Sequence, residues 1–293
     1  MGRAEQSDRF VVIKRKFGYL EPYRGAAPDA SQILHERGFV VLPEVYSASE
    51  VAELADDIER VFRECPRDAR PSTESTPGDD LFRYEMLNRS AVCQRAVARP
   101  AVLEVIEPLL GEDCHVIANT AWRNPVGQEG SHGGQMWHID AGPHVPRPPG
   151  IAWPDEVPYP VFAVATHVLL TDSRLEDGPT GVIPGSHRSG QHPPFDALLD
   201  ESLSYEGQRC VPALGRAGDV VLFVSDIWHR RMPTLAGEQG RFFLQVHYGR
   251  RDIAQRLRTA SEGGQLSKEA IERAKTERER TVIGLHAPQF YDG

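Results

Sequence analysis

The pattern of apolar and polar residues divides the chain into a helical first part, a middle part rich in short strands and a charged end. Residues 38–43 read GFVVLP, which predicts a short buried strand stopped by proline. Ser47 and Glu50 then form an S-x-x-E capping box, a pattern that starts helices. Apolar residues follow at helical spacing: Val51, Leu54, Ile58 and Val61. Together they predict a well-defined amphipathic helix.

The rest of the first part is predicted to contain two irregular segments and one more helical region. Residues 1–35 carry mixed charge without a clear period and are expected to form an irregular arm. Residues 66–81 hold three prolines among small and charged residues, which is typical of a surface loop. A second helical region is predicted over about 92–110, and Gly111 is placed to end it.

From about residue 114 the chain changes to short apolar segments separated by Gly/Pro turns. Strands are predicted over residues 115–123, 135–140, 161–171, 180–183, 219–224 and 241–249. This texture favours a β-sandwich or barrel. Residues 141–160 contain seven prolines, so they cannot form a central strand and are expected to be a lid over the substrate. Ser267 is a plausible N-cap for a charged helix over 268–280.

The composition is that of an ordinary soluble globular protein, with 40% hydrophobic and 26% charged residues in 293. One large domain with terminal additions and two small domains both fit this length. The net charge of −9 argues against nucleic acid or an anionic membrane as the main partner. No apolar run approaches the roughly 18 residues of a membrane span, and the first residues lack a signal-peptide core, so a cytoplasmic protein is expected. The cysteines are scattered without a C-x-x-C pair, so the sequence predicts neither a disulfide framework nor a zinc ribbon.

One H-x-D sequence, His138-Ile139-Asp140, is a candidate half of a metal site. On a strand the side chains of residues i and i+2 point to the same face, with their Cα atoms about 7 Å apart. An imidazole and a carboxylate on one face suit Fe(II) if a third ligand, another histidine, arrives from elsewhere in the chain. A hydrogen-bonded His–Asp pair without a metal is the alternative.

A third ligand is expected at the end of a distant strand. The predicted strand over 219–224 is followed by SDIWH, which ends at His229. Twelve residues later Arg241 opens another strand. An arginine beside a metal ligand would form a bidentate clamp for a cosubstrate that carries a carboxylate.

The order and spacing of these motifs resemble the phytanoyl-CoA dioxygenase family of Fe(II)/2-oxoglutarate oxygenases. The resemblance covers most of the chain, from GFVVLPEVYSASEVAEL through WHID, EDGPTGVIPGSHR and GDVVLF…WH to RFFLQVHY. It implies a mainly β fold with flanking helices, built around a double-stranded β-helix (jelly-roll, cupin-like) core. In that arrangement residues 1–293 form a single oxygenase domain. Residues 1–113 form the arm and helices, 114–250 the core with the lid, and 251–293 a helical tail.

The resemblance also implies roles for individual residues. His138, Asp140 and His229 correspond to the three iron ligands, which are also the catalytic residues. Arg241 corresponds to the residue that binds the C5 carboxylate of 2-oxoglutarate.

Two more residues are candidates for cosubstrate binding. Gln135 stands three residues before His138, where some members of the family place a glutamine on 2-oxoglutarate. Strand parity, however, puts it on the opposite face unless a bulge re-aims it. Thr180 matches a small hydroxyl residue of the family, and an ordinary sheet threonine is the alternative.

Substrate contacts are predicted for His167, Arg123 and Trp153. Many relatives carry a tryptophan near the position of His167, and a core histidine is the alternative there. Arg123 closes a predicted strand, and its alternative is surface exposure. Trp153 belongs to the expected lid.

The predicted function is an Fe(II)- and 2-oxoglutarate-dependent dioxygenase that uses O2 and releases succinate and CO2. The substrate is expected to be a small molecule, most plausibly a secondary-metabolite intermediate, oxidised by hydroxylation, desaturation or cyclisation. Alternatives are an acyl-CoA or amino-acid hydroxylase of the same family, a non-oxidative cupin-like metalloenzyme, and a binding module without turnover. The expected state is a monomer or homodimer without nucleic acid or membrane partners.

Overall fold

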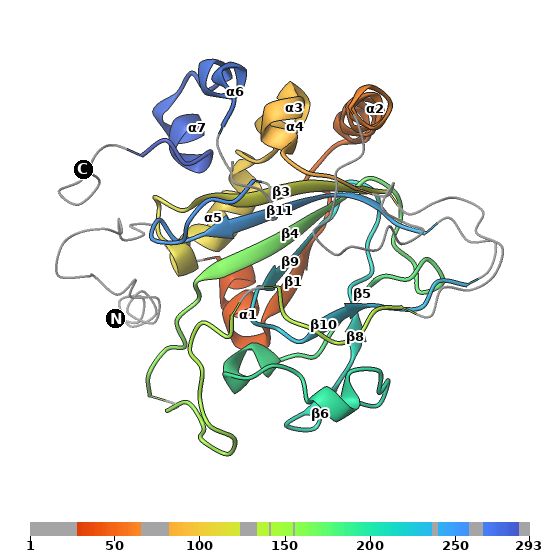
Figure 1. Cartoon of the computed structure of the whole chain (residues 1–293), viewed down its shortest axis with the longest axis vertical. Coiled ribbons are helices and arrows are strands. Elements are labelled where there is room, and N and C mark those ends of the chain that lie inside the picture. The colour runs from red at the N-terminus through yellow and green to blue at the C-terminus, as the bar shows by residue number, and fades with distance from the viewer. Residues whose placement is uncertain are drawn as a thin grey trace.

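The computed structural model describes residues 28–65, 82–123, 134–140, 142–154, 156–235, 240–257 and 266–286. The predicted loop over 66–81 and the first 27 residues of the predicted arm lie outside the described residues. Two sheets face each other, and a layer of helices covers the outer face of the larger sheet (Figure 1). A sheet-dominated fold with flanking helices is therefore confirmed.

The larger sheet contains six strands in the order β1-β9-β4-β11-β3-β2. Their bounds are Phe39–Leu42 for β1, Phe82–Arg83 for β2, His115–Arg123 for β3, Ala163–Leu169 for β4, Val220–Val224 for β9 and Phe242–Gly249 for β11. Every pair of neighbours is antiparallel. Strands far apart in sequence therefore lie side by side, as β11 does between β4 and β3.

The smaller sheet has the order β10-β5-β8 and lies across from the larger one (Figure 1). Its strands are β5 (Thr180–Val182), β8 (Val211–Pro212) and β10 (His229–Arg231). A separate hairpin joins β6 (Ser204–Tyr205) to β7 (Gln208–Arg209). Two 3-10 turns, Ser186–Ser189 and Phe195–Ala197, connect the strands at this side of the molecule.

The period of two along β11 separates the helix-covered core from the space between the sheets. Leu244, Val246 and Tyr248 are buried in the large core cluster that includes the helices. The intervening residues, Phe243 and His247 among them, line a pocket on the opposite face. One strand thus contributes both to the apolar core and to the candidate site.

The helices are α1 (Asp29–Arg37), α2 (Ala48–Glu64), α3 (Met86–Arg89), α4 (Ala91–Ala96), α5 (Pro100–Leu110), α6 (Lys268–Arg273) and α7 (Glu277–Val282). The amphipathic helix predicted after Ser47 is confirmed as α2, which buries the predicted stripe of apolar residues. The region predicted over 92–110 is two helices, because the helix that begins at Pro100 cannot continue the one before it. Likewise the predicted helix over 268–280 is interrupted, since Thr276 starts a new capping box with Glu279.

Two predictions of local structure were wrong. Residues 29–35 of the predicted arm belong to α1, which Gly38 ends in the left-handed conformation. This helix has only a weak apolar stripe, so the sequence pattern did not predict it. It is stabilised by tertiary contacts, such as the hydrogen bond that the Ser31 hydroxyl donates to the carbonyl of Val105. Residues 135–140 form no regular strand but an extended segment with a single β-bridge, from His138 to His229.

Replacing Ser47 by alanine is expected to lower the free energy of unfolding by about 1 kcal/mol. The Ser47 hydroxyl accepts a hydrogen bond from the Glu50 backbone, and the Glu50 carboxylate accepts one from the Ser47 backbone. The substitution leaves a donor at the start of α2 without its partner. Urea unfolding measures the change, with the exposed Ser204→Ala as the matched control. Equal stability of the two variants would contradict the capping role.

Candidate metal centre and active site

A cluster of two histidines and one aspartate lies at the edge of the smaller sheet. The backbones of His138 and His229 exchange two hydrogen bonds, each 2.9 Å long, so the two imidazoles project to the same side. Asp140 lies two residues further along the extended segment, where its backbone N–H donates to the carbonyl of Ser225 (3.1 Å). One ligand atom from each of His138, Asp140 and His229 lies within 4.8 Å of the others. The structure therefore brings together the three residues that the sequence suggested.

Both imidazoles of this cluster are oriented by backbone carbonyls. The Nδ1 of His138 lies 2.8 Å from the carbonyl of Met136, and the Nδ1 of His229 lies 2.9 Å from that of Ile227. A carbonyl only accepts, so these bonds place the proton on Nδ1 and leave the lone pair on Nε2. Nε2 of His229 lies 3.4 Å from Oδ1 of Asp140. Carbonyl-oriented histidines with a free Nε2 are typical of metal ligands.

The electrostatics of the cluster keep a negative charge at its centre. Burial alone would raise the pKa of Asp140, but His229, His247 and His138 around it hold that pKa well below the ordinary value. Burial also lowers the pKa of His138, and His229 lowers it further, so its imidazole is neutral at pH 7. Burial lowers the pKa of His229 as well, but the Asp140 carboxylate raises it overall, so the two side chains attract each other. Two imidazole nitrogens and one carboxylate form the facial donor set that suits Fe(II).

His247 is a fourth histidine at this cluster and was missed from the sequence. It lies on β11, and its Nε2 is 3.6 Å from Oδ2 of Asp140. Burial lowers the pKa of His247. The period of two along the predicted strand could have revealed it, because Phe243, Gln245 and His247 follow Arg241 at every second position.

A half-buried arginine lies beside the cluster and supplies an anion site. Arg241 Nη1 donates to the hydroxyl of Thr180 (3.1 Å), while Arg241 Nε is buried without an acceptor among the described residues. Burial lowers the pKa of Arg241 to about 9, with Arg231 adding to the effect. His167 Nδ1 lies 3.3 Å from the same hydroxyl, and burial followed by the charge of Arg241 lowers the pKa of His167 well below its ordinary value. A largely desolvated cation without an acidic partner in the described part of the chain fits the terminal carboxylate of 2-oxoglutarate.

One pocket of about 660 Å³ contains the cluster and the arginine. Its lining includes all of the predicted metal and cosubstrate residues: Gln135, His138, Asp140, Thr180, His229 and Arg241, together with His167. Gln135 reaches this pocket although regular strand parity puts it on the other face. The reason is that the segment before His138 is not a regular strand and bonds to β10 through the Gln135 backbone and the carbonyl of Arg231 (2.9 Å).

Aromatic residues form one wall of the same pocket. Trp122 of β3 stacks on Phe243 of β11, with ring centroids 6.4 Å apart and an interplanar angle of 12°. The indole Nε1 of Trp122 donates to Gln245 Oε1 (2.8 Å), which fixes the ring. Tyr84 also lines the pocket. This wall was not predicted, because cross-strand register places its members together and the sequence does not give that register.

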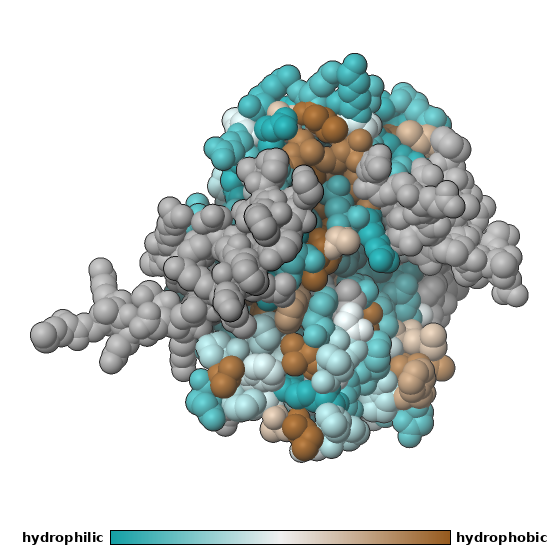
Figure 2. All heavy atoms as spheres, turned by 60° about the vertical axis from the view of Figure 1, so that its left-hand side comes forward, coloured by the Kyte–Doolittle hydropathy of each residue, from teal (hydrophilic) through white to brown (hydrophobic). Residues whose placement is uncertain are grey.

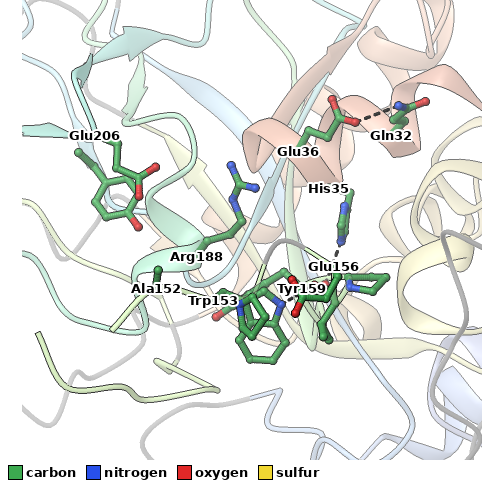
Figure 3. Close-up of a pocket in the computed structure, with 13 residues that line it drawn as sticks. Gln32, His35, Glu36, Ala152, Trp153, Glu156, Tyr159, Arg188 and Glu206 are labelled. Atoms are coloured by element: carbon green, nitrogen blue, oxygen red, sulfur yellow. Dashed lines mark hydrogen bonds between the residues drawn. The ribbon is translucent and has the colours of Figure 1, made fainter. Parts of the chain in front are cut away.

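Two predicted substrate contacts do not reach this pocket. Arg123 forms an ion pair with Glu59 of α2, and its guanidinium lies over the ring of Phe62 (4.5 Å to the centroid). Trp153 lines a different cavity of about 530 Å³, where it lies near Tyr159 and Arg188 (Figure 3). The indole packs edge-on against Tyr159, with centroids 5.1 Å apart.

The segment predicted as a lid lines this second cavity, and none of its described residues lines the metal pocket. Its first part is tied away from the pocket, since the backbone and the imidazole of His144 both bond to the carboxylate of Asp226. Arg147 then bonds through its backbone to the carbonyl of Gly190 (3.1 Å). These contacts direct the chain toward α1, where the carbonyl of Tyr159 meets His35 (2.9 Å). The described residues of the predicted lid therefore contribute to the second cavity and not to the lining of the metal pocket.

The fold and the donor set together define the non-haem iron oxygenases as the class that this chain resembles. The sequence pattern of the phytanoyl-CoA dioxygenase family matches residues 34–233. The chain belongs to this family.

Among curated proteins, the chain is similar to the ectoine dioxygenase of Bordetella bronchiseptica, with 28% identity over 192 residues. This match covers 64% of the chain but only 58% of that relative. It is also similar to the L-proline trans-4-hydroxylase of Streptomyces griseoviridis, with 31% identity over 158 residues that cover 52% of each protein.

Solved structures of the same fold are also found. EctD from S. alaskensis matches with a TM-score of 0.61 and 21% identity, over 85% of this chain and 88% of that one. SnoK, an alpha-ketoglutarate-dependent carbocyclase from nogalamycin biosynthesis, matches with a TM-score of 0.57 and 20% identity, over 79% of this chain and 87% of that one. At these identities the likeness concerns the fold.

In the part of the chain that the structure describes, no helix is both long and apolar enough to cross a bilayer. On the face drawn in Figure 2, hydrophilic residues cover most of the described surface, and hydrophobic ones gather in a narrow central band.

Proposed function

We propose that this protein is an Fe(II)- and 2-oxoglutarate-dependent dioxygenase that oxidises an unactivated C–H bond of a small molecule. The observation that carries the proposal is a His–Asp–His cluster in the pocket, with an arginine beside it that pairs with no acidic side chain among the described residues. A non-oxidative cupin-like enzyme would need the metal ligands but would have no use for Arg241. Because Arg241 has no acidic partner among the described residues, its presence in the pocket favours the oxygenase.

We further propose a double-stranded β-helix core. Two facing antiparallel sheets and the likeness to EctD and SnoK support it. In such a core the ligands come from opposite ends of the strand-rich region yet meet at one mouth, as His138 and His229 do across their β-bridge.

The protein's part in the reaction is to hold and orient. His138, Asp140 and His229 would bind the iron, and the Nδ1 bonds of both imidazoles keep Nε2 directed at it. Arg241 would bind the C5 carboxylate of 2-oxoglutarate, with Thr180 fixing the guanidinium. When bound, iron, 2-oxoglutarate and O2 supply the oxidising power, with succinate and CO2 as co-products.

His167 and Gln135 would complete the wall of the cosubstrate site. Because His167 is buried and its pKa is strongly lowered, it stays neutral and adds no second cation next to Arg241. Gln135 offers an amide toward the same pocket.

The substrate is proposed to be a small secondary-metabolite intermediate. A pocket of about 660 Å³ is in the range of small-molecule sites, and cosubstrate and metal occupy part of it. The related proteins named above, an ectoine dioxygenase and an L-proline hydroxylase, also act on small molecules. This size makes a free small molecule a better fit than a whole acyl-CoA.

The reaction is expected to add oxygen or remove hydrogen, and not to add halogen. Asp140 supplies a carboxylate at the position that chloride would need, and its negative charge disfavours an anion there. A metabolite panel incubated with iron, 2-oxoglutarate and O2 in chloride buffer tests this by mass spectrometry. The expected product gains one oxygen or loses two hydrogens, with one succinate released per turnover. A chlorinated main product, or turnover without 2-oxoglutarate, would contradict the proposal.

A further inference from the structure

A second arginine in the metal pocket has no acidic partner among the described residues. Arg256 lines the pocket at its solvent-exposed side, since the residue itself is exposed. Its backbone N–H donates to the carbonyl of Ile117 (2.7 Å). The neighbouring Gln255 side chain donates to the carbonyls of Val116 (2.7 Å) and Ile283 (2.8 Å). The backbone that carries Arg256 is thus fixed against the start of β3.

The charges that line the pocket do not balance. Of the residues that the structure describes, four arginines line it against one carboxylate, Asp140, which belongs to the metal cluster. Arg230 lies 3.6 Å from Glu201, and Arg231 donates to the hydroxyl of Thr234 (2.7 Å). Arg241 is assigned to 2-oxoglutarate. Arg256 remains as a cation for which neither the described residues nor the cosubstrate provides an anion.

The strand register separates this cation from Arg241. On β3, Ala118 pairs with His247 of β11. The residue before Ala118 is Ile117, whose carbonyl accepts the hydrogen bond from the Arg256 backbone. His247 contacts Asp140 at the metal cluster. Arg241 lies six residues back along β11, which is about 20 Å of extended strand. The backbones of the two arginines therefore lie next to opposite ends of β11, while both side chains line the same pocket.

We propose that Arg256 binds a carboxylate of the substrate, so that the enzyme acts on a small organic acid with an apolar body. The inference rests on the proposed function, which assigns Arg241 to the cosubstrate. A single planar guanidinium matches one carboxylate, while Trp122 and Tyr84 offer aromatic surface to the rest of the molecule. Arg256 is then a residue that determines specificity.

Benzoate and benzamide provide matched probes, because they share the ring and differ in the negative charge. Their binding to the anaerobic protein, saturated with Fe(II) and 2-oxoglutarate so that Arg241 is occupied, is measured by isothermal titration calorimetry. Benzoate is expected to bind at least about tenfold more tightly than benzamide, as a charge-assisted hydrogen bond implies. In Arg256→Gln this preference should disappear. Arg256→Lys should keep part of it, since the charge stays and the fork is lost.

Arg209→Gln is the matched control, because Arg209 is exposed on the β6–β7 hairpin and should leave the benzoate preference at the wild-type level. Circular dichroism and thermal melting of Arg256→Gln show whether it folds. Equal affinity for benzoate and benzamide, no benzoate binding, or a preference that survives in Arg256→Gln would overturn the inference. A wild-type protein that fails to bind 2-oxoglutarate would instead refute the proposed function, so the two failures are distinguishable.

Discussion

A His138→Ala variant is expected to lose Fe(II) at concentrations that saturate the wild type, and to lose turnover with it. His138 supplies one of three ligand atoms that lie within 4.8 Å of each other. Substitution of residues that only orient a ligand commonly costs 10–100-fold in metal affinity, so removing a ligand should cost more than about 100-fold. The visible absorption band of the anaerobic complex with Fe(II) and 2-oxoglutarate measures the loss, together with the bound iron content.

His192→Ala is the matched control for this experiment, since His192 is exposed and lies outside the metal pocket. Its absorption band and iron content should equal those of the wild type. A band of wild-type intensity in His138→Ala would remove His138 from the ligand set. It would also leave the reciprocal His138–His229 pairing without a functional explanation.

An Arg241→Ala variant is expected to need roughly 10²-fold more 2-oxoglutarate. Charge-assisted hydrogen bonds contribute about 1.5–3 kcal/mol each, and a guanidinium can form two to one carboxylate. Arg241 is half-buried, and its hydrogen bond to Thr180 leaves the rest of the guanidinium available for the cosubstrate. Lysine should restore part of the affinity. Titration of the absorption band with 2-oxoglutarate gives the dissociation constant directly.

Arg188→Ala is the control here, because Arg188 lines the second cavity together with Trp153 (Figure 3). Its 2-oxoglutarate requirement should stay at the wild-type level. An unchanged 2-oxoglutarate requirement in Arg241→Ala would mean that another cation of the metal pocket binds the cosubstrate. Arg231 would then be the first residue to mutate.

Local patterns of apolar, polar and turn residues predicted most of the helices and strands. The α2 helix was predictable because its capping box and apolar stripe are complete within residues 47–61. Five of the six strands of the larger sheet were predictable because they are apolar runs bounded by turn residues. The two-residue strand β2 was not predicted. By contrast, α1 and the breaks in the other helical regions depend on contacts with distant residues or on local caps that a single period does not display.

The three candidate ligands were predictable because their residue types and order are informative. Their convergence was not, since it depends on the pairing of residues 134–140 with β10, which are about ninety residues apart. His247 and Trp122 were missed for a related reason. They enter the pocket through the register of β11 against β3, which local sequence does not fix.

The structure did not place Arg123 and Trp153 at the metal pocket. Neither residue type requires a particular position in such a site, unlike the metal ligands. Arg123 was expected near the substrate, but α2 offers Glu59 and Phe62 to it, and the arginine packs there. Trp153 and the proline-rich segment around it follow Asp140 in the chain. Proximity in sequence to a ligand suggested a lid, yet the contacts of His144 with Asp226 lead the segment elsewhere.

The most direct test of the account is a crystal structure of the wild-type protein grown anaerobically with Fe(II) and 2-oxoglutarate, with diffraction recorded on both sides of the iron absorption edge. The account predicts one strong anomalous peak within coordination distance of Nε2 of His138, Nε2 of His229 and a carboxylate oxygen of Asp140, with the 2-oxoglutarate C5 carboxylate on Arg241. An iron peak elsewhere in the chain, or a peak at this cluster that lacks any one of the three residues as a ligand, would contradict it.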